Sequence, residues 1–156
     1  MTNTFNIVLF NPQIPPNTGN ILRLCATTGS KLHIIKPIGF KIDEKSLRRA
    51  GLDYYKNVDL KVYESLDEFL KFNTFSNLFL ITKYGKKRYD EVKYARNDFF
   101  MFGSEINGLS EEVYKKLSGS LKIYIPMIPG NRSLNLANAV SICIYEAWKQ
   151  INFLCV

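Results

Sequence analysis

The sequence predicts a single α/β domain, residues 1–156, built on a mostly parallel sheet of six strands that is flanked by helices. Short apolar runs alternate with helical patterns from one end of the chain to the other, which is typical of strands joined by crossover helices. The last three runs are continuously apolar. Such runs indicate strands that are buried on both faces, as in the centre of a parallel sheet.

The elements can be assigned in chain order from these runs and from capping residues. The expected strands cover residues 5–10, 31–36, 60–64, 77–82, 98–103 and 121–126. The expected helices cover residues 17–29, 43–51, 65–72, 111–117 and 134–153. Residue types favoured at helix ends stand at Asn17, Asp43, Ser65 and Ser110 (starts) and at Gly29 and Gly51 (ends). Ser65 with Glu68 three residues later also forms a capping-box pattern.

Composition is that of a globular protein. Hydrophobic residues make up 46% and charged residues 22% of the 156 residues, which suits one domain with a sizeable core. No apolar run approaches the roughly 18 residues of a membrane span, and the opening MTNTFNIVLF lacks the features of a signal peptide. We therefore expect a cytoplasmic protein without a membrane segment.

Several common chemistries lack the residues they need. Cys25, Cys143 and Cys155 are odd in number and widely spaced, which indicates neither a disulfide framework nor a metal site. The single histidine, His33, lies in a predicted strand, where a structural role is expected. Neither a GxGxxG after the first strand nor a GxxxxGK[ST] motif is present. What remains is group transfer by positioning and electrostatics.

The formal net charge of +7 favours a polyanionic partner. Basic residues gather in two clusters: Lys45, Arg48 and Arg49, and Lys83, Lys86, Lys87 and Arg88. Either cluster taken alone is more simply explained as a solvated, solubilising surface.

Polar residues follow the first, fifth and sixth predicted strands, at the edge where open α/β sheets bind ligands. Arg23 lies one helical turn after Gly19 among apolar neighbours, where a guanidinium needs an anion, either an internal carboxylate or a bound phosphate. Glu105 stands between two glycines, in a tight turn or a ligand site. Ser133 can cap the last helix, but capping leaves Asn135 without an explanation, and such amides suit a polar cofactor.

Three segments resemble the three motifs of the SPOUT methyltransferases: NPQIPPNTGNILRLCATTG, FGSEINGLS and IPMIPGNRSLNLANAVSICIYEAW. The resemblance is closest to the small single-domain branch that 2′-O-methylates the wobble nucleotide of tRNA, and it extends from about residue 5 to residue 153. It implies a deep carboxyl-terminal trefoil knot, with the knot and cofactor region at about 77–150. It also implies a homodimer that binds S-adenosylmethionine (SAM), releases S-adenosylhomocysteine, needs no metal and acts on the anticodon stem-loop.

The resemblance assigns roles to particular residues. The catalytic positions it implies are Arg23, Glu105, Asn135 and Tyr145. The cofactor positions it implies are Ile81, Gly103, Ile125 and Ser133. The basic residues Arg48, Arg49, Lys86, Lys87 and Arg88 are candidates for RNA binding. Two alternatives remain at this point: a ribose methyltransferase for another RNA site, and a knotted RNA-binding protein without catalytic activity.

The sequence departs from the family pattern in its second motif. Family members usually carry proline where Ser104 and Ser110 stand, and arginine where Asn107 stands. Losing that positive charge removes any substrate contact that the arginine makes in relatives. On the last helix, Val140, Ile144, Ala147 and Ile151 form an apolar stripe, extended sideways by Tyr145 and Trp148. This stripe is either a dimer contact or part of the core.

Overall fold

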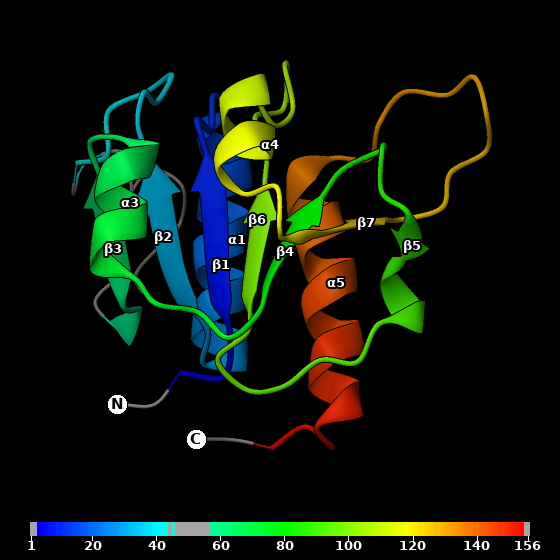
Figure 1. Ribbon diagram of the computed structural model, residues 1–156. Helices are drawn as coiled ribbons and strands as arrows, with labels where there is room; N and C mark the ends of the chain where they lie inside the picture. Colours follow the sequence, from blue (N-terminus) through cyan, green and yellow to red (C-terminus); the bar gives the residue numbers. More distant parts are fainter. Residues whose placement is uncertain (1–2, 44, 46–56, 155–156) are drawn as a thin grey trace.

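The computed structural model, shown in Figure 1, describes residues 3–43, 45 and 57–154. Its centre is a seven-stranded sheet in the order β3-β2-β1-β6-β4-β7-β5, and every pairing in it is parallel. The strands are β1 (Asn6–Phe10), β2 (Lys31–Ile35), β3 (Leu60–Tyr63), β4 (Leu78–Ile81), β5 (Lys87–Arg88), β6 (Phe99–Phe102) and β7 (Leu121–Tyr124). The predicted α/β class and the parallel sheet are confirmed.

The predicted count of six strands is wrong by one. All six expected strands are present, and the additional strand is β5, which pairs only with β7 at the edge of the sheet. It consists of Lys87 and Arg88 alone. Two charged residues have no hydrophobic pattern, so the periodicity of the sequence does not predict this strand.

Helices cover both faces of the sheet. They are α1 (Pro15–Thr28), α3 (Leu66–Phe72), α4 (Glu111–Lys116) and α5 (Leu136–Gln150), with a short 3-10 turn, η2 (Tyr89–Glu91). In Figure 1, α3 and α4 lie in front of the sheet and α1 lies behind it. The predicted helix over 43–51 falls almost entirely outside the described residues.

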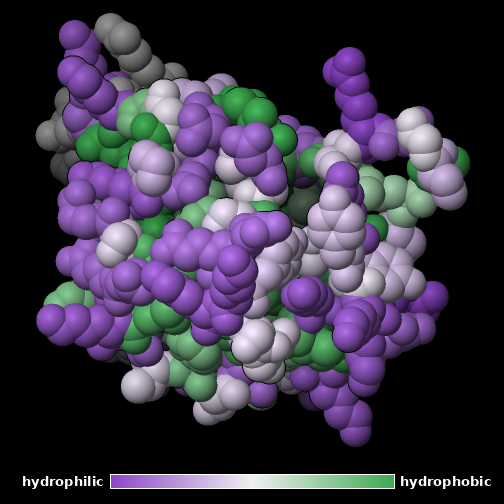
Figure 2. All heavy atoms as spheres, turned by 45° about the horizontal axis from the view of Figure 1, so that its top comes forward, coloured by the Kyte–Doolittle hydropathy of each residue, from purple (hydrophilic) through white to green (hydrophobic). Residues whose placement is uncertain are grey.

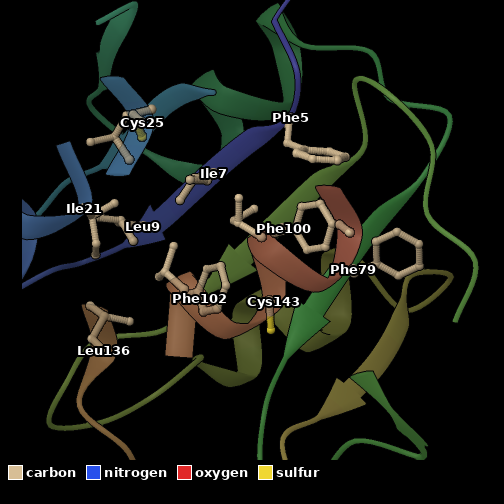
Figure 3. Close-up of a cluster of buried hydrophobic side chains, with 14 of the residues drawn as sticks. Phe5, Ile7, Leu9, Ile21, Cys25, Phe79, Phe100, Phe102, Leu136 and Cys143 are labelled. Atoms are coloured by element: carbon tan, nitrogen blue, oxygen red, sulfur yellow. The ribbon is translucent and has the colours of Figure 1, made fainter. Parts of the chain in front are cut away.

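Two hydrophobic cores lie on the two faces of the sheet, and alternate residues of β1 point into each. Ile7 and Leu9 pack in the core with α1 and α5, whereas Val8 and Phe10 pack in the core with α3 and α4. Figure 3 shows the first core, where Cys25 and Cys143 lie among the apolar side chains. Both are free thiols, so they serve as small apolar core residues.

Several predicted helix ends are confirmed. The Ser65 hydroxyl accepts a hydrogen bond from the Glu68 backbone N–H at 3.1 Å, and Ser110 accepts one from Val113 at 3.4 Å. The Glu68 carboxylate binds the backbone N–H of Glu64, one residue before the expected partner. Gly29 ends α1 with φ of 67°, a left-handed conformation that favours glycine.

Two predicted caps are wrong. The helix α1 starts at Pro15, two residues before Asn17, after an N-cap residue that offers no side-chain hydrogen bond. The helix α5 starts at Leu136, so the cap is Asn135 rather than Ser133, and its side chain accepts from the Asn138 N–H at 3.2 Å. Both predictions failed because Asn17 and Ser133 are residue types that favour the N-cap position, although neither helix uses them there.

His33 is structural, as predicted. Its side chain lies inside the sheet's second core, where Nε2 donates to Asn6 Oδ1 at 3.1 Å and Nδ1 accepts from the Tyr63 hydroxyl at 2.9 Å. The Asn6 amide in turn donates to the Asn97 carbonyl at 3.0 Å, which fixes Asn6 Oδ1 as the acceptor. Burial, with a smaller contribution from nearby Lys31, lowers the pKa of His33 to about 3.

The free energy of unfolding is expected to fall by about 2 kcal/mol between pH 7 and pH 5 because of His33 alone. The ordinary histidine pKa of 6.5 applies to the unfolded chain, whereas the folded chain holds the ring neutral down to about pH 3. The unfolded state therefore binds more protons in this window. Urea unfolding of the wild-type protein and of His33→Gln at both pH values checks this: an equal pH dependence in both proteins would contradict it.

The β4–β5 connection (Thr82–Lys86) straddles β7. Ile81 and Lys87 lie on opposite sides of Ile123 in the sheet register, so only five residues join two strands that have another strand between them. The connection is pinned at both ends, because the Thr82 N–H donates to the Ile123 carbonyl and the Lys86 N–H to the Lys122 carbonyl, each at 3.0 Å. Figure 1 shows β7 between β4 and β5.

Gly85 lies where the β4–β5 connection passes over the β7 backbone. A Cβ atom at this residue would stand 2.3 Å from the Ile123 carbonyl carbon and 2.5 Å from the Tyr124 nitrogen. Backbone atoms at that distance cannot be accommodated by a rotamer change. The close passage of the connection over β7 therefore requires glycine.

Candidate active site

The three motif segments meet at the carboxyl-terminal edge of the sheet. β1 and β6 are neighbours with Leu9 opposite Phe102, so the segments that follow them leave the sheet side by side. The arrowheads of β1, β2 and β6 lie at the upper edge in Figure 1. Figure 2 turns this edge toward the viewer and shows hydrophilic side chains over most of it, interrupted by apolar patches. Ligands bind at this edge in open α/β sheets.

Glu105 binds the start of α1. One carboxylate oxygen accepts from the Gln13 N–H at 2.8 Å, and the other accepts from the Ile14 N–H at 3.1 Å and from the Asn17 side-chain amide at 3.2 Å. Both backbone donors precede the first residue of α1, so a carboxylate from a distant loop anchors the segment that leads into this helix. The negative charge also lies at the positive end of the helix dipole.

Asn17 extends this contact to the third motif. Its amide donates to Glu105, and its carbonyl oxygen accepts from the Asn135 amide at 2.8 Å. Glu105, Asn17 and Asn135, here called the amide network, thus connect the loops after β1, β6 and β7. Asn17 is only 5% exposed, and a buried amide needs such partners. Sequence reasoning missed it by reading Asn17 as a helix cap.

The second motif forms a compact turn that explains two of its residues. The Ser104 and Gly108 backbones exchange hydrogen bonds of 3.1 and 2.9 Å, and the Ser104 hydroxyl accepts from the Ile106 N–H at 3.2 Å. The Ser104 side chain thus helps to shape this turn. A Cβ at Gly103 would stand 2.1 Å from the Gly108 carbonyl carbon, so this turn itself requires glycine there. Asn107 lies exposed at its tip.

Three of the four predicted cofactor positions are neighbours in the sheet. Ile81 at the end of β4 lies opposite Phe102, directly before Gly103, and also opposite Ile123, two residues before Ile125. Ser133 differs, because it is exposed in the segment between β7 and α5 that projects from the body of the molecule in Figure 1. The register therefore groups the first three, and the structure places Ser133 on a separate arm.

The four predicted catalytic residues divide into two groups. Glu105 and Asn135 belong to the amide network, whereas Arg23 and Tyr145 lie on the outer faces of α1 and α5. Arg23 is six residues beyond Asn17, roughly 9 Å along the helix axis. It is exposed, and its guanidinium forms no ion pair within the described part of the chain. Of the two partners that the sequence suggested for Arg23, the internal carboxylate is therefore not found among the described residues.

Tyr145 is far from the amide network of its own chain. It lies ten residues beyond Asn135 on α5, roughly 15 Å along the axis. Its side chain is 42% exposed and packs edge-on against Trp148, with ring centroids 5.6 Å apart. A tyrosine side chain cannot span that distance, so within one chain Tyr145 does not reach the amide network.

The basic candidates differ in how free their charges are. Lys86 and Lys87 are exposed and form no ion pair with any residue that the structure describes. Arg88 is held by Asp90, with Nη2 3.1 Å from Oδ2, and this contact raises the pKa of Arg88 and lowers that of Asp90. Its charge is therefore already balanced. Arg48 and Arg49 lie outside the described residues.

Neither a metal site nor a membrane span is found in the parts of the chain that are described. No group of three or more His, Cys, Asp or Glu side chains within residues 3–43, 45 and 57–154 could hold a metal ion. Over the same residues, every helix is too short or too polar to cross a bilayer.

A parallel sheet whose carboxyl-end loops converge on a carboxylate and two amides defines an α/β protein with a ligand site at that edge. The model of the SpoU rRNA Methylase family matches residues 4–145. The chain belongs to this family, which confirms the resemblance to SPOUT methyltransferases.

Individual relatives are similar over nearly the whole chain. The tRNA (cytidine(34)-2'-O)-methyltransferase of Escherichia coli (strain K12) is 48% identical over 148 residues, which cover 95% of this chain and 94% of that protein. A putative RNA methyltransferase from Bacillus anthracis has a solved structure with 44% identity and a TM-score of 0.89, covering 96% of this chain and 95% of that one. A structure solved for insights into 2-OH methylation of C/U34 on tRNA has 38% identity and a TM-score of 0.86, covering 96% and 97%.

Proposed function

We propose that this protein is a SAM-dependent tRNA 2′-O-methyltransferase that modifies the ribose of the wobble nucleotide, cytidine or uridine, in the cytoplasm. The observation that carries this proposal is the amide network, which joins the three motif loops at one edge of the sheet. High identity to a tRNA (cytidine(34)-2'-O)-methyltransferase over nearly the full chain supports the choice of substrate.

The residues present fit the cofactor. Ile81 ends β4, and Gly103 and Ile125 directly follow β6 and β7, the two strands on either side of β4. Apolar side chains beside exposed backbone groups suit an adenine ring, and we assign these three residues, with Ser133, to holding SAM. Bound there, SAM supplies an electrophilic methyl group for the ribose 2′-oxygen.

Glu105 acts as a positioning residue in this proposal. Its two oxygens already accept three hydrogen bonds from the start of α1, so the carboxylate holds the first and second motifs in register. Asn135 completes the connection to the third motif through Asn17. Preorganised loops of this kind contribute much of an enzyme's rate enhancement, because small displacements of the reacting groups lower the rate strongly.

Arg23 supplies the positive charge for the reaction. A guanidinium stays protonated at physiological pH and is a poor base, so we assign it to clamping a substrate phosphate and stabilising the negative charge that develops on the 2′-oxygen. Its exposure and the absence of an ion pair within the described residues leave this charge available.

We further propose a homodimer in which Tyr145 completes the site of the partner subunit. Val140, Ile144 and Ala147 of the predicted stripe are fully buried in the core, so the interface uses the outer side of α5. There Tyr145, Trp148 and Phe153 form a cluster of edge-packed rings, two of them with 42% and 51% of their surface exposed. Tyr145 lies too far from the amide network of its own chain to contact it, which supports a role in the active site of the partner subunit.

The proposal includes the deep trefoil knot within residues 77–150 of a single domain. Support comes from the β4–β5 connection, which passes over β7 so closely that Gly85 cannot carry a side chain. A strand enclosed in this way, with a helix of 15 residues after it, is the arrangement that a threaded chain produces.

Incubation with labelled SAM and bulk tRNA, followed by mapping of the ribose methylation, tests the proposed function. We expect one methyl group on the 2′-oxygen of the first anticodon nucleotide. Methylation at another position would favour a ribose methyltransferase for a different site. RNA binding without transfer would favour the non-catalytic knotted protein.

Mixing Glu105→Gln protein with Tyr145→Ala protein is expected to restore activity that neither variant has alone. If Tyr145 serves the partner's site, each mixed dimer holds one site with both native residues and one with neither. Random exchange then gives about a quarter of the wild-type rate per site, since about half of the dimers are mixed. Activity that stays at the level of the separate variants would place both residues in one chain's site, and a monomer in sedimentation would exclude the shared site.

A further inference from the structure

Tyr84 is an aromatic residue left in the open beside the candidate active site. Its side chain is 67% exposed, although tyrosine usually buries much of its ring. Among the described residues, the Lys83 ammonium lies over this ring, 5.2 Å from its centroid. Core packing therefore does not explain an aromatic side chain at this position.

The backbone around Tyr84 is held by several hydrogen bonds. The Thr82 hydroxyl accepts from the Tyr84 N–H at 3.2 Å and pairs with the Tyr114 hydroxyl of α4 at 2.8 Å. The Gly85 N–H closes the turn onto the Thr82 carbonyl at 3.0 Å. The turn is thus fastened to β7 and to α4, so that Tyr84 is presented from a fixed support and its ordering on binding costs little entropy.

The position of this turn relates it to the site. It follows Ile81 directly, and Ile81 lies between Phe102 of β6 and Ile123 of β7 in the sheet. The turn therefore leaves the sheet between the loop that carries Glu105 and the segment that carries Ser133. In Figure 1 the β4–β5 connection rises at the same edge as these two segments.

The charges around Tyr84 are unpaired. Lys83, Lys86 and Lys87 are exposed and form no ion pair within the described residues, whereas Lys31, Lys36 and Lys116 elsewhere each bind a carboxylate. Unpaired ammonium groups around an exposed ring match a nucleotide, which has a flat base and a charged phosphate.

We propose that Tyr84 is a stacking platform for an unpaired base of the substrate RNA, flanked by Lys83, Lys86 and Lys87, which bind the adjoining phosphates. This inference rests on the proposed function, because the RNA in question is the methyltransferase substrate. Stacking tolerates any base, so this contact sets affinity and the placement of the loop rather than the identity of the base.

The test compares Tyr84→Ala, Tyr84→Phe and Phe72→Ala in binding an anticodon stem-loop at fixed salt concentration. Phe72 is a matched control, because it is 57% exposed and lies near Lys61 and Lys71 on α3, beside the opposite edge of the sheet. Tyr84→Ala is expected to weaken RNA binding about tenfold and to raise the KM for tRNA, with SAM affinity unchanged. Tyr84→Phe retains the ring and should bind within about twofold of wild type.

Equal RNA affinity of Tyr84→Ala and wild type would overturn the inference, as would an equal loss in Phe72→Ala. These results are separable from failure of the proposed function. If the wild-type protein methylates the wobble ribose while Tyr84→Ala binds normally, only the stacking role is wrong. If the wild-type protein transfers no methyl group, the proposed function is wrong, and the binding titration still decides the role of Tyr84.

Discussion

Replacing Arg23 by alanine is expected to lower the rate of methyl transfer by about a thousandfold while SAM affinity stays within about twofold. The guanidinium is exposed on α1, whereas the residues assigned to the cofactor belong to other segments, at the ends of β4, β6 and β7 and before α5. Removing it takes away the charge that stabilises the reacting oxygen, a loss of about two to three orders of magnitude for single donors of this kind. Single-turnover rates and calorimetric titration of SAM measure the two effects separately.

Asn20→Ala provides the control for Arg23→Ala. Asn20 lies on the same exposed side of α1, and its side chain forms no hydrogen bond within the described residues, so its removal should leave turnover nearly unchanged. Arg23→Lys should recover part of the lost rate, because it restores the charge without the planar fork. A large loss of SAM binding in Arg23→Ala would show that the arginine serves the cofactor rather than the substrate.

Replacing Gly85 by alanine is expected to lower the free energy of unfolding by about 3 kcal/mol or more. The added Cβ would stand 2.3 Å from the Ile123 carbonyl carbon, and the β4–β5 connection cannot move away because its ends are hydrogen-bonded to β7. The sheet must therefore distort or lose the β5 pairing. Urea unfolding curves measure the change.

Gly119→Ala is the matched control for Gly85→Ala. Gly119 is exposed between α4 and β7, and nothing lies within 4 Å of a Cβ added there. Its replacement should leave the unfolding midpoint almost unchanged or raise it slightly, because alanine restricts the unfolded chain. Similar unfolding midpoints for the two variants would contradict the close passage over β7.

The sequence was most informative where a pattern repeats along an element. The six longer strands follow from apolar runs and their parallel order from the alternation with helices. The strand β5 was not predicted, because its two charged residues show no hydrophobic periodicity. Helix starts were the weaker part, because Asn17 and Ser133 are good capping types that the chain does not use as caps.

For the site, residue types were predicted better than contacts. The motifs identified Glu105 and Asn135, but the contact between them depends on Asn17, which lies 88 positions before one and 118 before the other. No local pattern indicates which of several polar side chains meets another across such separations. The long distance between Tyr145 and the amide network likewise becomes clear only once the length of α5 is known.

The β4–β5 connection also has a consequence for how the chain is made. Residues 82–86 are synthesised before β7, so a ribosome delivers the enclosing segment first and the enclosed strand about forty residues later. In the knotted topology proposed above, either the whole carboxyl-terminal part passes beneath a closed connection, or the connection closes over β7 after that strand has been synthesised. A chain cut within 82–86 escapes this constraint, and we expect it to assemble faster than the intact protein.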